Sequence, residues 1–403
     1  METCCCIAGG GPAGMMLGFL LARAGVEVVV LEKHRDFLRD FRGDTIHPST
    51  LELMFELGLL EDFLKRPHQE LKQIGAQLDD FALTIADFTH LPVHSKFVGL
   101  MPQWDFLSFL AEKAKKYPAF QLRMETEVTD LIEENGRIRG VRARTPQGEL
   151  EVRADLTIGA DGRRSVLRQR AGLQVIDSGA PIDVLWMRVP RRPDDPDATL
   201  GRVRDGTILV MLNRADYWQC AYLIPKGGFA EIQRRGLEAF RADVVKAAPF
   251  LRGRANELKS WDDIKLLSVA VDHLKSWSRP GLLCIGDSAH AMSPVGGVGI
   301  NLAIQDAVAA ANRLWKPLLH GESTDLWLRR VQDRRSFPTR MTQRLQVLAH
   351  KKVIAPTLAN RTAIRELPVP MRMLRDYPFL RRIPARVVGL GFRPEHVRSP
   401  EVS

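Results

Sequence analysis

A glycine-rich segment near the start of the chain constrains the fold more than any other feature. The run Gly9-Gly10-Gly11-Pro12-Ala13-Gly14 follows an apolar strand pattern, Cys4 to Ala8, and precedes a segment with apolar residues at helical spacing that ends at Gly25. A second strand pattern, Val26 to Leu31, ends at Glu32, about 20 residues after the turn. This order is typical of the βαβ unit that binds a dinucleotide.

Each glycine of this turn has a separate physical role. Gly9 makes the tight turn, Gly11 lets the backbone approach a diphosphate, and Gly14 lets the helix pack closely on the strand. The helix N-terminus favours the negative charge of the phosphates. Glu32 can accept hydrogen bonds from both hydroxyls of an adenosine ribose. Dinucleotide binding is therefore favoured over a glycine turn without a ligand.

Two later segments place an acid at the end of a strand. Leu156 to Gly159 leads into Ala160-Asp161-Gly162, and Leu283 to Gly286 leads directly into Asp287. Each pair alone could be an ordinary turn, but ligands in parallel sheets bind at the carboxyl ends of strands. The run Pro294 to Asn301 then supplies glycines and a helix start that can face the pyrimidine edge of a flavin. Together the segments indicate an FAD site.

Composition sets the class of protein. The chain has 403 residues with 45% hydrophobic and 26% charged content, which suits a soluble protein of two domains. Cys4, Cys5 and Cys6 are adjacent in a strand, so their side chains alternate between faces and should be reduced core residues rather than metal ligands. No metal site is expected. Because no leader or membrane-spanning run is visible, a cytoplasmic protein is expected.

The net charge of +10 has two possible interpretations. Basic residues that look dispersed and often lie beside acids favour a solvated surface over nucleic-acid binding. The C-terminal segment from Val369 to Arg398 is both basic and apolar. A packed arm is favoured there, and peripheral membrane contact is the alternative.

The strand and helix patterns predict an α/β protein with two domains and a C-terminal segment. Strands alternate with helices in the first segment, as far as Gly58, whereas the stretch from about 178 to 275 has the pattern of broad antiparallel strands. The predicted division is residues 1–72, 98–177 and 276–345 for the FAD-binding domain, 73–97 and 178–275 for the substrate domain, and 346–403 for a helical C-terminal segment.

At the three motifs the sequence resembles the class A flavoprotein monooxygenases, the family of para-hydroxybenzoate hydroxylase. Gly9 to Gly14, Asp161-Gly162 and Gly286-Asp287 match the three family signatures in order, and the resemblance extends over most of residues 1–350. It implies a Rossmann-like FAD-binding domain of the glutathione-reductase type. An antiparallel β-sheet substrate domain is inserted in it, and a helical C-terminal segment follows.

The resemblance also implies roles for individual residues. Glu32 would meet the adenosine ribose, Arg42 and Gln103 the diphosphate and ribityl region, and Asp287 the ribityl chain. Asp161 would serve both FAD and the nicotinamide. The full set of implied cofactor-binding residues is Gly9, Gly11, Pro12, Ala13, Gly14, Glu32, Lys33, Arg42, Gln103, Val128, Asp161, Gly286, Asp287, Pro294, Gly297, Val298, Gly299, Ile300 and Asn301, of which Pro294, Gly297, Gly299 and Asn301 would meet the isoalloxazine.

The activity implied by the resemblance is hydroxylation of an aromatic or polyketide-like small molecule. In this family NAD(P)H docks transiently and reduces noncovalent FAD, and O2 then forms the flavin C4a-hydroperoxide that hydroxylates the substrate. The aromatic and sulfur-containing strand residues Trp186, Met211, Trp218 and Tyr222 would form either a roof over the flavin or ordinary core.

Several questions stay open in the sequence. No side chain identifies itself as a catalytic acid or base, since His47 and His290 beside the motifs suit packing as well as proton transfer. A monomer and a homodimer are equally compatible with the sequence. The alternative functions are alkene reduction of the geranylgeranyl reductase type, flavin-dependent halogenation, and a redox-inactive FAD-binding regulator. The stretch Trp218 to Pro225 resembles a halogenase signature but lacks its second Trp.

Overall fold

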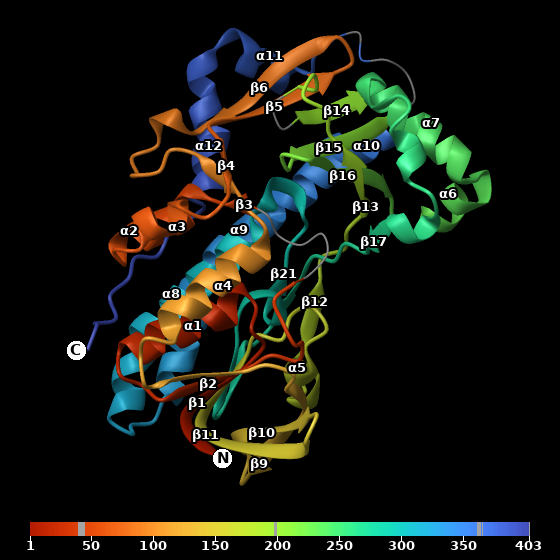
Figure 1. Cartoon of the computed structure of the whole chain (residues 1–403). Helices are drawn as coiled ribbons and strands as arrows, with labels where there is room; N and C mark the ends of the chain where they lie inside the picture. The colour runs from red at the N-terminus through yellow and green to blue at the C-terminus, as the bar shows by residue number, and fades with distance from the viewer. Residues whose placement is uncertain (39–44, 197–199, 361–363, 365, 403) are drawn as a thin grey trace.

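The computed structural model describes residues 1–38, 45–196, 200–360, 364 and 366–402. Two large sheets lie at opposite ends of the molecule, and long helices run between them (Figure 1). This arrangement confirms the predicted α/β class with a Rossmann-like part, a second sheet and a helical C-terminal segment.

The first sheet contains the glycine motif. Its strand order is β19-β20-β11-β1-β2-β8, with the meander β9-β10 attached to β11. β20, β11, β1, β2 and β8 run parallel. The bounds are β1 Glu2–Ala8, β2 Val28–Leu31, β8 Phe120–Arg123, β9 Glu127–Glu134, β10 Arg137–Thr145, β11 Gly148–Gly159, β19 Ser278–Arg279 and β20 Leu282–Cys284.

β11 spans a range in which the sequence patterns predict two separate strands, Leu150 to Arg153 and Leu156 to Gly159. It is continuous over 12 residues, because no Gly or Pro interrupts the chain between Gly148 and Gly159. Its first half pairs with β10 and its second half with β1 and β20. One strand therefore joins the meander to the site edge of the parallel sheet.

Helices α1 (Pro12–Arg23), α4 (Gln103–Ala114), α8 (Gly299–Leu319) and α9 (Asp325–Ala349) pack in the first part of the fold. The ten residues from Ala13 to Ala22 are all buried, because α1 lies between the sheet, α4 and α8. The expected one-sided apolar face of α1 is therefore apolar nearly all round. Cys5 and Cys6 belong to cores on opposite faces of the sheet, and all five cysteines are free.

The second sheet has seven strands in the order β17-β13-β16-β15-β14-β5-β6. It is antiparallel as expected except for the pair β14–β5, which is parallel. The sequence patterns missed β14. The bounds are β5 Gln73–Leu78, β6 Phe81–Asp87, β13 Ile182–Pro190, β14 Leu200–Arg204, β15 Thr207–Asn213, β16 Tyr217–Pro225 and β17 Lys265–Leu267.

The two faces of this sheet have different neighbours. Helices α6 (Phe229–Arg235) and α7 (Leu237–Ala247) lie against one face, where Met211, Trp218 and Tyr222 form their core. Trp186 packs on the opposite face with Val295 of the Pro294 loop. Since side chains alternate along a strand, the idea that all four side chains form one roof is wrong.

Shorter elements connect the two sheets. Two three-stranded sheets have the orders β3-β7-β4 and β12-β18-β21. The bounds are β3 Thr45–Ile46, α2 Pro48–Glu56, α3 Leu60–Leu64, β4 Gln69–Leu71, β7 Val98–Leu100, α5 Val166–Arg170, β12 Val175–Asp177, β18 Asp272–Leu274 and β21 His290–Ala291.

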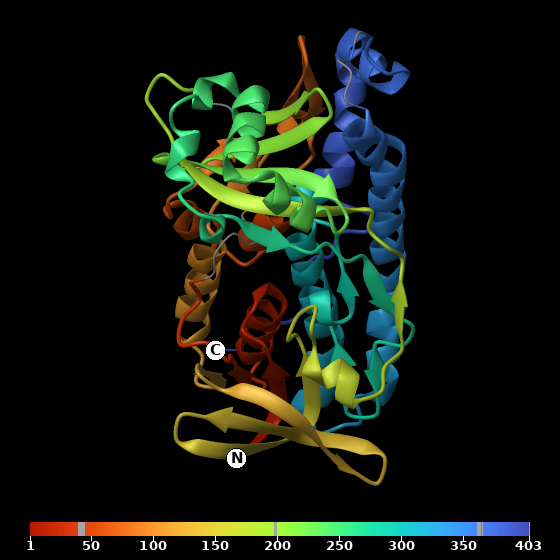
Figure 2. The same cartoon turned by 90° about the vertical axis from the view of Figure 1, so that its right-hand side faces the viewer.

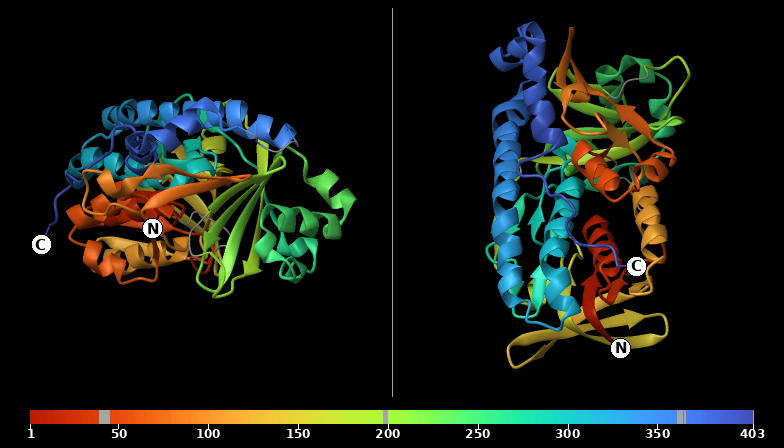
Figure 3. Two further views of the ribbon diagram at one scale, coloured as in Figure 1. Left: turned by 90° about the horizontal axis from the view of Figure 1, so that it is seen from above. Right: turned by 90° about the vertical axis from the view of Figure 1, so that its left-hand side faces the viewer.

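The C-terminal part is helical and then extended. A π-helical turn, His350–Ile354, continues α9 into α10 (Ala355–Ala359), and α11 (Val369–Asp376) and α12 (Arg382–Gly389) follow. Residues 390–402, here called the C-terminal arm, run back along the first part of the fold (Figure 3), and Val402 N donates to Arg23 O. None of the helices in the described ranges is long and apolar enough to cross a membrane.

Candidate functional site

The three sequence motifs meet at one edge of the parallel sheet. Ala8, Gly159 and Cys284, at the ends of β1, β11 and β20, are aligned neighbours. Ala160 N donates to Ala8 O at 2.8 Å, and Ile285 N donates to Gly159 O at 2.9 Å. The glycine turn, Asp161 and Gly286-Asp287 therefore lie together at the carboxyl ends of parallel strands, where ligands bind.

Of the three motif glycines, Gly9 and Gly14 have no room for a side chain, whereas Gly11 faces open space. A Cβ on Gly9, which has φ +107°, would lie 2.3 Å from Ala160 O, and one on Gly14 would lie 2.0 Å from Gly9 O. A Cβ on Gly11 would meet nothing within 4 Å. No side chain caps the N-terminus of α1, so its first amides and the space at Gly11 form a cradle for an anion.

Glu32 lies beside this cradle and is only 8% exposed. Its Oε2 accepts from Gly10 N at 2.9 Å and its Oε1 from His34 N at 3.1 Å. Thr126 N donates to Glu32 O, which brings the start of β9, and with it Val128, to the same end of the sheet. These positions suit the adenosine end of FAD.

Three other predicted positions are less informative. Lys33 is exposed next to Glu32, and Gln103 is the first residue of α4, which packs on α1. Arg42 lies outside the described residues.

Asp161 carries a buried oxygen without a protein partner. Its Oδ2 accepts from Leu167 N at 3.2 Å, whereas Oδ1 has no hydrogen bond with any described residue. Burial raises the pKa of Asp161. Because a buried carboxylate oxygen without a partner is costly, this oxygen fits a ligand that brings hydroxyl donors.

Asp287 forms an ion pair with Arg163 beside Asp161. Arg163 Nε lies 3.0 Å from Asp287 Oδ2, and the two side chains are 31% and 34% exposed. Arg163 also donates to Met292 O through Nη2, while its buried Nη1 has no partner among the described residues. Asp287 thus keeps one oxygen for a ligand, and Arg163 keeps one donor.

Replacing Asp287 by Ala is expected to weaken FAD binding about tenfold, roughly 1 to 2 kcal/mol, because the ribityl hydroxyls lose a charged acceptor. FAD titration of the apo variant measures the effect. Asp287→Asn, which keeps one acceptor oxygen, should lose less. An unchanged dissociation constant in both variants would mean that Asp287 serves only Arg163.

The Pro294 loop is tied to the segment after β3. Gly297 has φ +63°, and a Cβ there would lie 2.3 Å from Thr45 Oγ1, which donates to Gly297 O. Asn301 Oδ1 accepts from His47 N at 2.9 Å and from Thr50 Oγ1 at 2.8 Å. Its Nδ2 donates to Thr45 O and Gly297 O. The Asn301 side chain is therefore fully engaged, and only its backbone amide is left for a cofactor.

The N-terminus of α8 offers that amide and its neighbours. No side chain caps this helix, and its first turn contains no acid. The amides of Gly299, Ile300 and Asn301 thus supply donors at the positive end of a 21-residue helix. With the Gly11 cradle and the partnerless Asp161 oxygen, this N-terminus fits a molecule that has a diphosphate, a polyol chain and an electron-poor ring, which is FAD.

Comparison with known proteins agrees with this geometry. Residues 2–345 match the FAD binding domain family. The chain is 32% identical over 406 residues to 6-methylpretetramide 4-monooxygenase of Streptomyces rimosus, covering 99% of this chain and 94% of that protein. The chain belongs to the class A flavoprotein monooxygenases. Its cofactor is FAD, as the motifs predicted.

Two further similarities extend the comparison. This monooxygenase is 28% identical to rifampicin monooxygenase of Streptomyces venezuelae, covering 77% of the chain but 63% of that longer protein. Its fold matches anhydrotetracycline hydroxylase of Streptomyces rimosus with a TM-score of 0.76 at 22% identity, covering 96% of this chain and 76% of that one.

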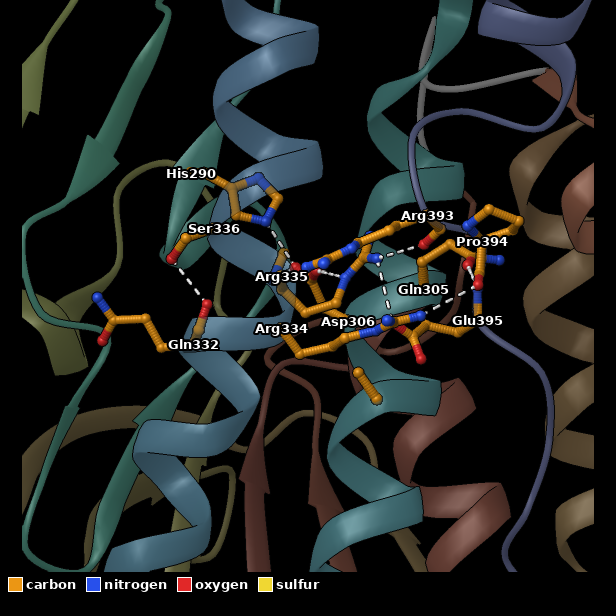
Figure 4. A network of polar contacts seen from close by, with 12 residues as sticks. His290, Gln305, Asp306, Gln332, Arg334, Arg335, Ser336, Arg393, Pro394 and Glu395 are labelled. Carbon is orange, nitrogen blue, oxygen red and sulfur yellow. Dashed lines mark hydrogen bonds and ion pairs between the residues drawn. The ribbon is translucent and has the colours of Figure 1, made fainter.

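A buried polar network around Asp306 was not predicted from the sequence (Figure 4). Asp306 Oδ2 accepts from Gly286 N at 3.1 Å and from His290 Nε2 at 2.6 Å, and its Oδ1 accepts from Arg335 Nε at 2.9 Å. Burial alone would raise the pKa of Asp306, but His290 and Arg335 outweigh burial and hold this pKa below its ordinary value. The sequence feature that could have indicated this network is Asp306, a charged residue within the mostly apolar run 302–311 of α8.

The network continues into the C-terminal arm. Arg335 Nη1 donates to Arg393 O and lies 3.4 Å from Glu395 Oε1, which Arg334 Nε contacts at 2.6 Å. Glu395 N donates to Gln305 Oε1. The arm is therefore connected through Asp306 to the turn that presents Asp287.

Both histidines beside the motifs have structural roles. His47 Nδ1 lies 2.7 Å from Val388 O, and because a carbonyl only accepts, this nitrogen carries the proton. Burial lowers the pKa of His47 to about 4, so the ring is neutral near pH 7. His290 is bound by Asp306. His290 Nδ1 is buried without a partner among the described residues, but its Nε2 is held by Asp306, and neither ring carries a contact that marks it as a substrate base.

Side chains of α9 and the π-helical turn hold the Pro294 loop from behind. Gln346 Nε2 donates to the carbonyls of Ser293 and Val295, each at 2.9 Å, and its Oε1 accepts from Ser293 N. His350 Nε2 lies 2.9 Å from Ser293 Oγ. The loop that would carry the isoalloxazine is thus fixed on its protein side.

Proposed function

We propose that this monooxygenase uses NAD(P)H and O2 to hydroxylate an aromatic, polyketide-like small molecule. The observation that supports this most is the meeting of all three flavin motifs at one sheet edge, in a chain 32% identical to a protein named 6-methylpretetramide 4-monooxygenase. Rifampicin monooxygenase and anhydrotetracycline hydroxylase are relatives named for other large polyketide-type compounds. These similarities support the proposal of a polycyclic substrate.

Within this proposal the residues of the site have distinct tasks. The amides at Gly11 hold the diphosphate, Glu32 the ribose, Asp161 and Asp287 the polyol chain, and the α8 N-terminus the pyrimidine edge of the ring. Bound FAD supplies the chemistry, taking electrons from NAD(P)H and activating O2. The same proposal includes the domain division predicted from the sequence and a cytoplasmic location. It also includes an oligomeric state of either monomer or homodimer.

The substrate pocket is proposed between the Pro294 loop and the second sheet. Val184, Trp186 and Val210 of that sheet pack with Val295 and Ile354 in an apolar cluster on the face opposite α7. Such a surface excludes water from the ring, which oxygen transfer requires. Trp186 Nε1 is buried and has no partner among the described residues, so it can donate to a substrate oxygen.

The direct test is NAD(P)H oxidation by the purified yellow protein in air, with and without polycyclic phenols. Labelled O2 should enter the product as one hydroxyl oxygen. Turnover of an alkene without O2 would instead support a reductase, and halide incorporation a halogenase. The halogenase reading is already disfavoured, because Trp218 is buried against α7 and donates to Asp195 Oδ2 at 2.8 Å.

NAD(P)H oxidation is expected to be at least about tenfold faster with a true substrate, a barrier change of about 1.4 kcal/mol. The chain has one dinucleotide motif, Gly9 to Gly14, which leaves NAD(P)H without a Rossmann site of its own, so filling the pocket can change how the ring is presented to a transiently docked NAD(P)H. Anaerobic stopped-flow measures the rate. Equal rates with and without a hydroxylated substrate would show that substrate does not gate the reaction.

A further inference from the structure

The positive charge of the chain is concentrated in one region, which corrects the expectation that it is dispersed. Residues 325–390 hold 15 of the 58 Lys and Arg but only 4 of the 48 Asp and Glu, a net charge of +11. Because the whole chain carries +10, all other residues together carry −1. The described part of this region lies along one side of the molecule (Figure 2).

Exposed apolar side chains are frequent along the same region, five of them between Leu326 and Val353, and are densest at its C-terminal end. This end is the hairpin of α11 and α12, residues 369–389, here called the C-terminal hairpin. Five of the eighteen large exposed hydrophobic residues in the described chain belong to it: Val369 at 58%, Met373 at 47%, Tyr377 at 54%, Phe379 at 63% and Ile383 at 62%. Such clustering on one surface marks an interaction site.

The hairpin has an inner side that the fold uses and an outer side that it does not. Met371 and Leu374 pack against Leu78 and Leu83 of the second sheet. Val388 packs in a cluster with Phe88. On the outer side Tyr377 and Phe379 contact each other with ring centroids 6.2 Å apart. The hairpin is therefore anchored by one face and presents aromatic and aliphatic side chains on the other.

The charges around these side chains indicate what the outer side binds. Arg372, Arg375, Arg382 and Arg386 are exposed on the hairpin, and its single acid, Asp376, is paired with Arg375 at 2.7 Å. Arginines beside protruding aromatic and aliphatic side chains are typical of helices that lie in an anionic membrane interface. A nucleic acid would match the arginines but would not bury the aliphatic tips. An acidic protein with an apolar groove would match both and is the alternative that the experiment below tests.

We propose that the C-terminal hairpin docks this monooxygenase on an anionic lipid surface. The five apolar side chains enter the headgroup region, and the arginines contact lipid phosphates. This proposal does not depend on the proposed substrate, because it rests on exposed side chains of the hairpin, whereas the hairpin meets the flavin site at the end of α12, where Val388 O lies 2.7 Å from His47 Nδ1.

Co-sedimentation of the FAD-loaded enzyme with vesicles tests the proposal. Binding to vesicles with about one-third phosphatidylglycerol should exceed binding to pure phosphatidylcholine vesicles at least about tenfold, and added salt should reduce it. No binding to either vesicle, or equal binding to both, would overturn the proposal. Absence of vesicle binding would favour an acidic protein as the partner.

A pair of double variants assigns the effect to the hairpin. Phe379→Glu with Ile383→Glu should lower binding to the anionic vesicles at least about tenfold. Ile176→Glu with Leu266→Glu adds the same charge at exposed strand positions elsewhere and should bind like the parent. Retained FAD and unchanged NAD(P)H oxidation in solution show that both variants fold. Equal loss in the two variants would overturn the role of the hairpin.

Discussion

Replacing Asp306 by Ala is expected to lower the free energy of unfolding by about 3 to 5 kcal/mol, because it removes the nearer of the two carboxylates that pair with the buried Arg335 cation and leaves only Glu395 at 3.4 Å. Gly286 N and His290 Nε2 lose their acceptor at the same time. Asp306→Asn should be nearly as damaging, since both carboxylate oxygens face donors and the new NH2 group would meet one of them. Urea unfolding at a fixed FAD concentration measures the loss.

A surface ion pair provides the control for this prediction. Glu151 pairs with Arg142 at 3.0 Å, and both side chains are more than half exposed, so Glu151→Ala should cost at most about 1 kcal/mol. If Asp306→Ala lowered the free energy of unfolding no more than Glu151→Ala does, the stabilising role assigned to the network would be contradicted.

The dependence on pH gives a second readout. His290 and Arg335 keep the pKa of Asp306 below its ordinary value of 3.8 despite burial. The stabilisation is thus complete above about pH 4 and is lost as the pH falls through the lower value in the folded protein. The difference in the free energy of unfolding between wild type and Asp306→Asn should therefore become smaller in that acid range.

The sequence predicted the site edge because its determinants are local. Gly9, Asp161 and Gly286 each follow an apolar strand within two residues, and parallel pairing brings the ends of such strands to one edge. Asn301 shows the limit of this reasoning. Its position at the start of α8 is as expected, but its side chain is occupied by Thr45, His47, Thr50 and Gly297. Only tertiary packing decides which atoms of a residue face a ligand.

The network around Asp306 could not be predicted from local pattern. Asp306 meets His290 16 positions away and Arg335 29 positions away, and Arg335 meets Glu395 60 positions away. Separations of this size depend on how α8, α9 and the C-terminal arm pack. The strand residues illustrate the same point. Trp186 and Met211 lie on opposite faces of the second sheet, because side chains alternate along each strand. Which of these faces is covered by α7 is known only from the tertiary structure.

Replacing Gly11 by Ala is expected to weaken FAD binding at least about 100-fold, about 2.7 kcal/mol, and to leave the fold nearly intact. The backbone at Gly11 has φ −75° and ψ −176°, which any residue adopts, and a Cβ would meet no protein atom within 4 Å. The methyl group therefore costs the apoprotein at most about 1 kcal/mol, as a poorer helix cap. It would stand between the first amides of α1 and the diphosphate, which loses charged hydrogen bonds.

Gly14→Ala is the matched comparison, with the same added methyl group three residues further on. Its Cβ would lie 2.0 Å from Gly9 O, so α1 must move away from β1 and the apoprotein itself should lose stability. FAD titration and urea unfolding of both apo variants separate the two effects. Gly11→Ala should bind FAD more weakly but unfold nearly like the wild type, because its added methyl group occupies ligand space. Gly14→Ala should show both weaker FAD binding and a lower free energy of unfolding. If Gly11→Ala bound FAD like the wild type, the diphosphate would have to lie away from the α1 N-terminus, and the cradle assigned here would be wrong.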